Sequence, residues 1–251
     1  MNKHKKIAAL VPAYNCGNVI GALIKELNSK NVFDFIIVID DCSTDDTYSR
    51  ASNIDRVHVF RNSKNLGYGG TSIELYKKAR ELGADYTVNF HGDGGHRVEA
   101  IYPLICELKK GKADIVIGSR LLFLKNQFKI NGWRIIIDRQ LRGNMPLVRL
   151  AGHLSLTYFQ NKILNLSLNS YHEGMRGCSS TAINWILSQQ LPSWYQFDNM
   201  LLSLAATDGL EISEISCKPN YAESANSSAP PIKYGITVLS LIYNFKKRPG
   251  K

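Results

Sequence analysis

Short apolar runs alternate with helical patterns along the first half of the chain. The run at 7–11 contains no polar residue, as expected for a strand that is covered on both faces, and apolar residues then recur every three or four positions from 19 to 27. The same pattern predicts further strands at 35–39, 57–60, 86–88 and 114–118. About five buried strands that alternate with helices indicate an α/β fold, with a mostly parallel sheet and helices on both faces.

Polar or small residues follow the ends of these strands, at 12–15, 40–41, 65–67 and 91–93. Because parallel strands end at one edge of a sheet, these loops should converge there, which is where open α/β sheets bind ligands. In the junction at 89–96, Asp93 lies between His91 and His96, and neighbouring glycines let the backbone approach a ligand. A carboxylate and imidazoles can hold a divalent metal. The alternative is a turn in which Asp93 caps the next helix.

Composition narrows the class of protein. The 251 residues are 44% hydrophobic with both charge signs dispersed, which is typical of a soluble globular protein, and we expect one domain over 1–251. No apolar run approaches the roughly 18 residues of a membrane-spanning helix, and the run at 7–11 is too short for a signal peptide. The five cysteines have no close pair and no metal-ligand spacing, which predicts a reducing, cytoplasmic compartment.

The net charge of +10 favours an anionic partner, and the second half shows where that charge gathers. Between residues 120 and 142, six basic residues and a single acidic one, Asp138, are interleaved with aromatic and aliphatic side chains. This composition is typical of an interfacial segment at an anionic membrane; the alternative is a basic face over an ordinary core segment. No acidic residue follows Glu223, and residues 236–248 can form a basic amphipathic end. No RNA-binding signature is present, so we expect no nucleic-acid partner.

Six short motifs are spread over the chain, namely Val11-Pro12-Ala13-Tyr14-Asn15, Asp40-Asp41-Cys42-Ser43-Thr44-Asp45, Asn65-Leu66-Gly67, His91-Gly92-Asp93, Gly118-Ser119-Arg120 and Gly174-Met175-Arg176. Their order and spacing resemble those of family-2 glycosyltransferases of the GT-A fold, and most of all the branch that uses polyprenyl and dolichyl phosphates. The resemblance covers about residues 5 to 245. It implies a Rossmann-like domain with a nucleotide-sugar-binding half at 1–120 and an acceptor half at 121–251.

The resemblance also implies roles for individual residues. The nucleotide pocket would be lined by Pro12, Ala13, Tyr14, Asn15, Asn65 and Gly67. Asp41 would bind the base and ribose. Asp93 would take the second acidic position of the family's Asp-x-Asp motif, where Mg²⁺ or Mn²⁺ bridges the donor diphosphate, and His91 stands at the first acidic position. Because Mg²⁺ prefers oxygen ligands and Mn²⁺ better tolerates an imidazole, His91 bears on which metal is used.

The chemistry of such a site depends on the negative charge that develops on the leaving phosphates. A metal held by Asp93 can stabilise that charge, and so can Arg120 and Arg176, because a guanidinium pairs with two phosphate oxygens at once. The alternatives are a surface arginine for Arg120 and a structural salt bridge for Arg176. Asp198 is the candidate general base for a hydroxyl acceptor, unless it caps its helix. A phosphate acceptor is already ionised and needs no strong base. His172 would lie toward the acceptor side.

The sequence therefore predicts a cytoplasmic, metal-dependent, inverting glycosyltransferase, peripheral at the inner face of the membrane. Its donor would be a UDP- or GDP-linked sugar, and its acceptor a polyprenyl phosphate. One alternative is the same donor chemistry on a soluble hydroxyl acceptor. A second is a catalytically silent nucleotide-sugar-binding protein, since His91 replaces a carboxylate. A nucleotidyltransferase is disfavoured, because no Gly-rich loop bearing Arg or Lys follows the first strand.

Overall fold

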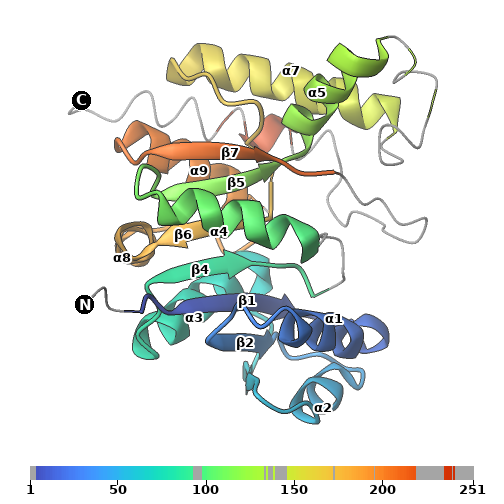
Figure 1. Ribbon diagram of the computed structural model, residues 1–251, viewed down its shortest axis with the longest axis vertical. Coiled ribbons are helices and arrows are strands. Elements are labelled where there is room, and N and C mark those ends of the chain that lie inside the picture. The colour runs from blue at the N-terminus through green and yellow to red at the C-terminus, as the bar shows by residue number, and fades with distance from the viewer. Residues whose placement is uncertain are drawn as a thin grey trace.

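The computed structural model describes residues 4–92, 98–132, 134, 138, 146–171, 173–194, 196–218, 235–238 and 240. These residues form a seven-stranded sheet with the order β3-β2-β1-β4-β6-β5-β7 (Figure 1). The strands are β1 (Ile7–Ala13), β2 (Phe35–Asp40), β3 (His58–Arg61), β4 (Tyr86–Asn89), β5 (Ile115–Ser119), β6 (Arg176–Ser179) and β7 (Ile212–Ser216).

Six of the strands run in parallel, and β6 is the exception. It lies antiparallel between β4 and β5, and its register places Arg176 opposite Asn89 of β4 and opposite Ile117 of β5. Because β6 runs the other way, its first residue lies at the edge where the other strands end. The motif 174–176 therefore reaches the same edge as the junctions that follow β1, β2, β4 and β5. The predicted α/β fold with a mostly parallel sheet is confirmed.

Helices cover both faces of the sheet, as predicted. One face carries α1 (Gly17–Ser29), α2 (Thr47–Ser52) and α4 (Ile101–Lys109), which a short 3-10 helix, η1 (Val98–Ala100), precedes. The other face carries α3 (Gly67–Glu81), α8 (Ser180–Ser188) and α9 (Phe197–Thr207) (Figure 1). Successive residues of β2 alternate between these layers: Ile36 and Val38 join one core, and Ile37 and Ile39 the other. Burial on both faces explains why the strands are continuously apolar.

Two helices extend the fold beyond β7: α5 (Arg120–Asn131) and α7 (Leu147–Leu164), at the top of Figure 1. Helix α5 begins where Ser119 Oγ accepts a hydrogen bond from the Leu122 N–H at 3.1 Å, an N-cap that ends β5 and starts the helix in one step. Neither helix contains an acidic residue. Within the described ranges, no helix is long and apolar enough to cross a membrane. The division into halves at residue 120 stays a prediction.

Candidate active site

The loops that follow β1 and β2 bind each other. Asn15 has a left-handed backbone, with φ at 48°, which Asn tolerates better than most residues. Its N–H donates to Ser43 Oγ at 2.9 Å, and its Oδ1 accepts a hydrogen bond from the Thr44 N–H, also at 2.9 Å. The side chain of Tyr14 beside it is 52% exposed. The first two predicted nucleotide motifs therefore form one unit at the carboxyl edge of the sheet.

Asp41 joins this unit to the third motif. The carboxylate is buried, and its Oδ1 accepts hydrogen bonds from Asn62 Nδ2 and from the Leu66 N–H, both at 2.8 Å. Asn65 Oδ1 accepts a hydrogen bond from the Gly67 N–H at 3.0 Å. The Asp41 carboxylate thus connects the end of β2 to the loop before α3, where the third motif lies.

Gly67 is required by the close approach of a distant loop. Its φ is 75°, and a Cβ at this position would lie 2.6 Å from Ser193 O. The same carbonyl accepts hydrogen bonds from the N–H groups of Gly69 and Gly70, at 2.7 and 3.0 Å. A helix N-terminus with open N–H groups can bind phosphate, but here the first turn of α3 binds a backbone carbonyl. The glycines at 67–70 hold the loop before α9 against α3.

A hydrogen-bonded network leads from the end of β4 into the core. His91 Nε2 lies 3.2 Å from Tyr68 Oη, and Tyr68 Oη donates to Asp198 Oδ1 at 3.0 Å. Arg176 Nη1 donates to the same carboxylate oxygen, and Arg176 Nε donates to Tyr76 Oη at 3.1 Å. The residues come from the junction after β4 and from α3, α9 and β6, so four segments that are distant in sequence meet around one ion pair.

This network is shut off from solvent on its inner side. Arg176 is fully buried, with its guanidinium 5.2 Å from the ring centre of Phe197, and the Asp198 side chain is 13% exposed. Burial raises the pKa of Tyr68 and of Tyr76 far above that of an ordinary tyrosine, so both hydroxyl groups keep their protons. Burial works against the charge of Arg176, but the Asp198 carboxylate, together with Tyr76, Tyr68 and Cys178, outweighs this and holds the pKa of Arg176 above its usual value.

The structure therefore pairs two predicted catalytic residues with each other. Arg176, expected to bind phosphate, forms the structural salt bridge that was its alternative, and its partner is Asp198, the candidate general base. Asp198 lies in the first turn of α9, where the N-cap residue is Gln196. Tyr68, which connects this pair to His91, was missed. Its only signal in the sequence is a place among the glycines at 67–70.

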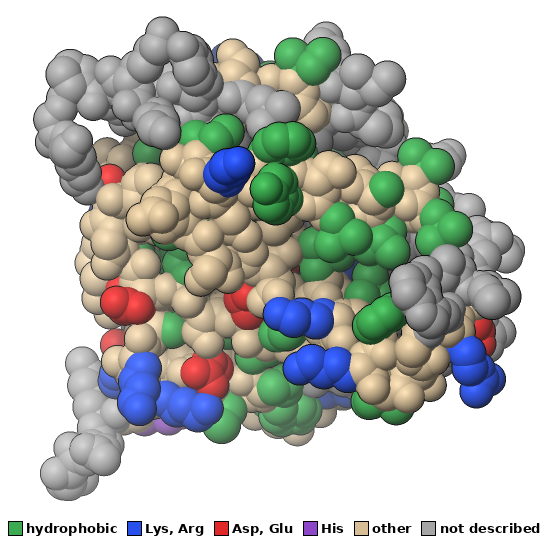
Figure 2. Space-filling view, turned by 90° about the horizontal axis from the view of Figure 1, so that it is seen from above, with side chains coloured by type: hydrophobic (Ala, Val, Ile, Leu, Met, Phe, Trp, Pro, Cys, Tyr) green, Lys and Arg blue, Asp and Glu red, His purple; other side chains and the backbone are tan. Residues whose placement is uncertain are grey.

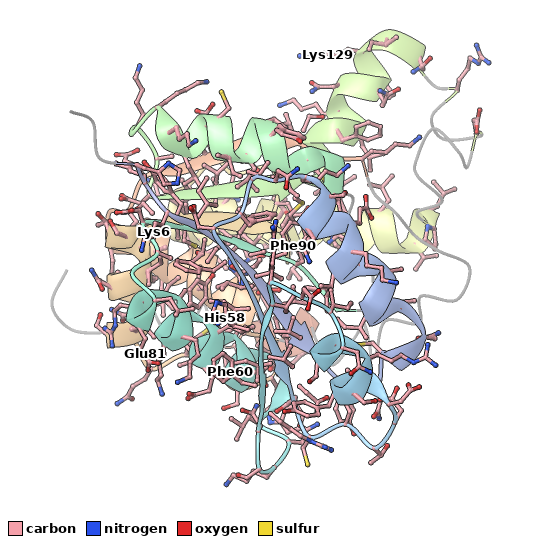
Figure 3. The ribbon with its side chains drawn as sticks, turned by 60° about the horizontal axis from the view of Figure 1, so that its bottom comes forward. Lys6, His58, Phe60, Glu81, Phe90 and Lys129 are labelled. Atoms are coloured by element: carbon pink, nitrogen blue, oxygen red, sulfur yellow. The ribbon has the colours of Figure 1, made fainter. Side chains whose placement is uncertain are left out.

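Side-chain alternation at the end of β4 aims His91 at this network. Phe90 is fully buried in the core under α1 and α4, with its ring centre 6.1 Å from that of Phe33 (Figure 3). Asn89, before it, lies on the opposite face and accepts a hydrogen bond from Tyr76 Oη at 2.8 Å. His91, after it, returns to the face of α3. Period-two alternation therefore continues through the junction and fixes which way the imidazole points.

Arg120 directly follows β5, which is separated by β6 from β4 and so from the junction with His91. Its N–H donates to Glu173 Oε1 at 3.0 Å and its Nε to Glu173 Oε2 at 2.7 Å. The Arg120 side chain is 25% exposed, whereas that of Glu173 is 2% exposed. Burial raises the pKa of Glu173, and the charge of Arg120 partly opposes this. Glu173 was not assigned a role from the sequence, although it directly precedes the motif at 174–176.

We expect the contribution of Glu173 to stability to fall as pH rises. Its pKa in the folded protein is raised above the ordinary 4.5, so the native state holds this proton more tightly than the unfolded chain does. The contribution is full below 4.5 and is lost as pH rises through the raised pKa. Urea unfolding of the parent and of Glu173→Gln should show the parent losing stability relative to the variant over this range. If the difference in the free energy of unfolding between the parent and Glu173→Gln does not change with pH, the pKa of Glu173 is not raised in the folded protein.

His91 is the described member of the predicted metal site. Asp93 lies outside the described residues, as do His96 and His172. Elsewhere in the described ranges, no group of three or more His, Cys, Asp or Glu side chains is arranged to hold a metal ion. The His91 ring lies at the carboxyl edge of the sheet against Gly174, where a Cβ would be 2.2 Å from Nε2. An imidazole held at this edge, two residues before a carboxylate, is a donor set that fits Mn²⁺.

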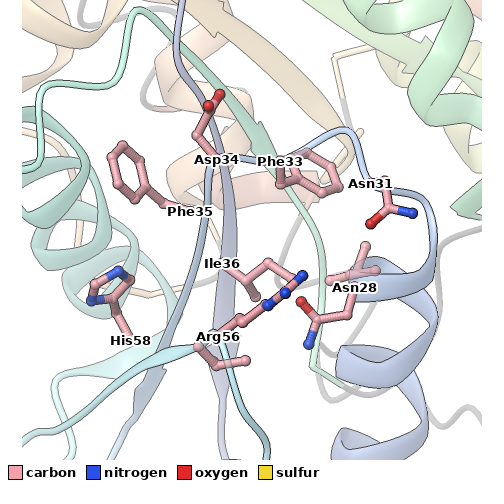
Figure 4. Close-up of a pocket in the computed structure, with 10 residues that line it drawn as sticks. Asn28, Asn31, Phe33, Asp34, Phe35, Ile36, Arg56 and His58 are labelled. Carbon is pink, nitrogen blue, oxygen red and sulfur yellow. The ribbon is translucent and has the colours of Figure 1, made fainter.

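A pocket of about 440 Å³ lies at the opposite edge of the sheet (Figure 4). Its lining includes Asn28 and Asn31 from the end of α1, and Phe35 and His58 from the starts of β2 and β3. The carboxylate of Asp34 there already accepts hydrogen bonds from the Ile7 N–H, at 2.8 Å, and interacts with His4. Because the predicted chemistry lies where the strands end, we assign no function to this pocket.

Comparison with known sequences places the chain in a family. The model of "Glycosyl transferase family 2" matches residues 8–173. A UDP-N-acetylglucosamine–dolichyl-phosphate N-acetylglucosaminyltransferase of Methanococcus voltae is 29% identical, over 93% of each chain. A dolichol-phosphate mannosyltransferase of Pyrococcus furiosus is 31% identical, over 58% of this chain and 41% of its own.

Solved structures show a similar fold at low sequence identity. Mannosyl-3-phosphoglycerate synthase from Rubrobacter xylanophilus gives a TM-score of 0.70, with 12% identity over 98% of this chain and 77% of its own. Glucosyl-3-phosphoglycerate synthase from Mycobacterium tuberculosis, in complex with Mn²⁺, UDP and glucosyl-3-phosphoglycerate, gives 0.62, with 17% identity over 98% and 82%. The fold is thus the expected GT-A glycosyltransferase fold, and, because the family model matches well over half of its length, the chain belongs to glycosyl transferase family 2.

Proposed function

We propose that this glycosyltransferase moves a sugar from a nucleotide sugar to a polyprenyl-phosphate-type lipid, with inversion, at a membrane surface. The observation that carries the acceptor is the similarity to the Methanococcus voltae enzyme, which acts on dolichyl phosphate and matches 93% of each chain. The GT-A fold and the site geometry support the donor. The main alternative is the same donor with a soluble hydroxyl acceptor.

The order of the strands suggests how the donor lies. Asp41 follows β2 and His91 follows β4, with β1 between them, so the two lie about 10 Å apart across the edge at ordinary strand spacing. A carboxylate accepts hydrogen bonds from a base or from ribose hydroxyls but repels phosphates, which supports the proposal that the nucleoside binds at Asp41. Tyr14 and Asn15 at the end of β1 would line the nucleotide between them. The diphosphate would then lie at the junction after β4.

His91 and Asp93 would hold the metal there, as Mg²⁺ or Mn²⁺. When bound, the ion supplies positive charge at the leaving diphosphate, and a related fold binds UDP together with Mn²⁺. Arg120 lies at the end of β5, on the other side of β4 from Asp41, and can add its charge on the acceptor side. This sequence of groups along the edge runs from nucleoside to diphosphate to acceptor.

The state of Asp198 favours a phosphate acceptor over a hydroxyl. A hydroxyl needs a base to take its proton, and Asp198 is the candidate for that role. Its Oδ1 already accepts hydrogen bonds from Arg176 and from Tyr68, so this oxygen is engaged by the protein itself and is not open to a hydroxyl acceptor. A phosphate monoester arrives ionised at neutral pH and requires no such base. The ion pair therefore suits the lipid phosphate better.

The surface of α5 and α7 has the composition of a surface that binds a membrane. Exposed apolar side chains on these helices are Phe128, Ile130, Leu147, Val148, Leu154, Tyr158 and Phe159. Exposed lysines accompany them at 125, 129 and 162, with no acidic residue in either helix. Figure 2 looks onto this end of the molecule and shows hydrophobic side chains at the surface near basic ones. We propose peripheral attachment at the cytoplasmic face through this surface, as interfacial helices attach.

The donor and acceptor are tested by incubating purified protein with a panel of UDP- and GDP-linked sugars and Mn²⁺. The expected result is that one donor releases its nucleoside diphosphate rapidly only when polyprenyl phosphate is present. Release that depends instead on a soluble sugar or alcohol would favour the hydroxyl-acceptor alternative. Binding of a nucleotide sugar without release under any condition would make the chain a binding protein rather than an enzyme.

A further inference from the structure

Trp194 is an exposed aromatic residue that contacts one of the predicted nucleotide motifs. It lies in the loop before α9 and is 58% exposed. A Cβ at Gly67 would lie 3.0 Å from Trp194 Cε3 and 3.1 Å from its Cδ2, so the six-membered ring of the indole lies against the backbone of Gly67. Gly67 belongs to the third motif, at the carboxyl edge of the sheet. The indole therefore contacts this edge, and more than half of the residue stays open to solvent.

The backbone that carries Trp194 is held from two sides. The carbonyl of Ser193 accepts hydrogen bonds from the N–H groups of Gly69 and Gly70, at 2.7 and 3.0 Å. The carbonyl of Trp194 accepts one from the N–H of Phe197 at 3.0 Å, and Phe197 is fully buried. A single exposed apolar side chain is ordinary on a protein surface. An indole on a fixed backbone differs from it, because a ligand that contacts the ring has little conformational freedom left to remove.

Gly67 lies between the two ends of the proposed donor site. The residue before it, Leu66, donates its N–H to Asp41, where we propose that the nucleoside binds. The residue after it, Tyr68, donates to Asp198 Oδ1 at 3.0 Å, in the first turn of α9. A ring that lies against Gly67 is therefore beside the part of the edge between the nucleoside end and Asp198.

We propose that Trp194 is a donor-binding residue and that its indole stacks on the sugar of the nucleotide sugar. The inference rests on the proposed function, because it needs a donor at this edge. The C–H groups on one face of a pyranose carry partial positive charge, and the face of an indole is electron-rich, so the two attract each other. The indole N–H can also donate a hydrogen bond to a sugar hydroxyl.

Two observations favour the sugar over the base as the group that stacks. Tyr14 is 52% exposed beside Asn15, which binds the loop after β2, so an aromatic ring is already available at the nucleoside end. Trp194 instead lies four residues before Asp198, in the segment that leads into α9. The sugar is the part of the donor that reacts, and Asp198 is the residue predicted at the reacting end.

Binding of the whole donor and of its nucleotide part alone tests this contact. Calorimetry with Mn²⁺ and a panel of UDP- and GDP-linked sugars first identifies the donor that the parent binds. Trp194→Ala should bind this donor about 10-fold more weakly, the size of a good aromatic contact, and should bind UDP or GDP as the parent does. Trp194→Phe keeps a ring and should keep most of the affinity.

Tyr102→Ala is the matched control, because it removes a ring that is 53% exposed on α4, on the opposite face of the sheet from α3. Its affinity for the donor and for the diphosphate should equal that of the parent. A purely structural role of Trp194 would instead lower both affinities together in Trp194→Ala, because a displaced loop would disturb the nucleotide motif as well.

Fluorescence reports the contact directly. The chain has three tryptophans, so replacing Trp133 and Trp185 with Phe leaves Trp194 as the only emitting indole. We expect the bound donor to change its emission and to protect it from quenching by acrylamide. UDP or GDP alone should protect it much less, because neither carries the sugar.

Three results would overturn the inference. One is an unchanged donor affinity in Trp194→Ala. Another is an equal loss of affinity for the donor and for the diphosphate, which would assign the indole to the base or to the loop. The third is protection of the indole by anionic vesicles but not by the donor, which would assign it to the membrane. A failure of the proposed function is distinguishable from all three, because the parent itself would then bind no nucleotide sugar.

Discussion

Asp93→Ala is expected to abolish metal-dependent binding of the nucleotide sugar, whereas His91→Ala should only weaken it and shift the preference among metals. Asp93 is the only carboxylate in the junction at 89–96, and Mg²⁺ and Mn²⁺ both depend on oxygen ligands. Loss of the imidazole leaves that oxygen in place but removes the nitrogen that favours Mn²⁺. Calorimetric titration of each variant with UDP- or GDP-sugar, in Mn²⁺ and in Mg²⁺, measures both effects.

A matched control for this pair is Asp55→Ala, which removes an exposed carboxylate from the loop before β3, at the opposite edge of the sheet. Its nucleotide affinity should equal that of the parent. Diphosphate affinity that is also unchanged in Asp93→Ala would remove Asp93 from the metal site. It would also remove the reason to expect a metal at the end of β4.

Attachment to anionic membranes is expected to be strong at low salt and nearly lost when Lys125, Lys129, Arg134 and Arg139 become Gln. Each Lys or Arg near an anionic bilayer contributes about 1 kcal/mol, so four together amount to about a thousandfold in binding. The attraction decays within a Debye length of about 8 Å, so high salt should release the protein. Lys125 and Lys129 are exposed on α5, and Arg139 lies outside the described residues. Co-sedimentation with vesicles measures the attachment.

The control for this variant removes the same number of positive charges from other parts of the surface. Gln at the exposed lysines 25, 77, 109 and 112, on α1, α3 and around the end of α4, should leave most of the attachment intact. Arg120 is unchanged in both variants, so activity on a short, water-soluble polyprenyl phosphate should survive in each. If the parent does not bind anionic vesicles at low salt, a soluble hydroxyl acceptor becomes the better explanation of the function.

The parallel strands of the sheet could be predicted from the sequence because they are buried on both faces. Continuous apolar runs predicted strands at 35–39 and 114–118, and β2 and β5 lie within one residue of them. The strand β6 was not predicted. Its four residues, Arg-Gly-Cys-Ser, carry no strand pattern, and they are extended because β4 and β5 flank them on both sides. Such pairing depends on contacts with strands that are distant in the sequence, and the residues of β6 themselves do not predict those contacts.

Part of the candidate site could likewise be predicted from the sequence, and part could not. The order of the motifs predicted that Asn15, Asp41 and His91 lie at one edge of the sheet, and the structure places them there. Tyr68 and the pairing of Arg176 with Asp198 could not be predicted, because their contacts join residues that are 22 to 130 positions apart. The apolar surface of α7 was missed for a related reason. A helical pattern predicts which residues share a face, but not that the face is exposed.

The most direct test of the account follows the sugar itself. Purified protein is incubated with a sugar-labelled donor, Mn²⁺ and polyprenyl phosphate; the bond from the anomeric carbon to the diphosphate breaks as one to the acceptor phosphate oxygen forms. The account predicts label in the organic phase as a lipid-linked sugar phosphate, one per nucleoside diphosphate released, with the anomeric configuration inverted. Label that stays in the aqueous phase, and moves only when a soluble hydroxyl acceptor is added, would contradict it.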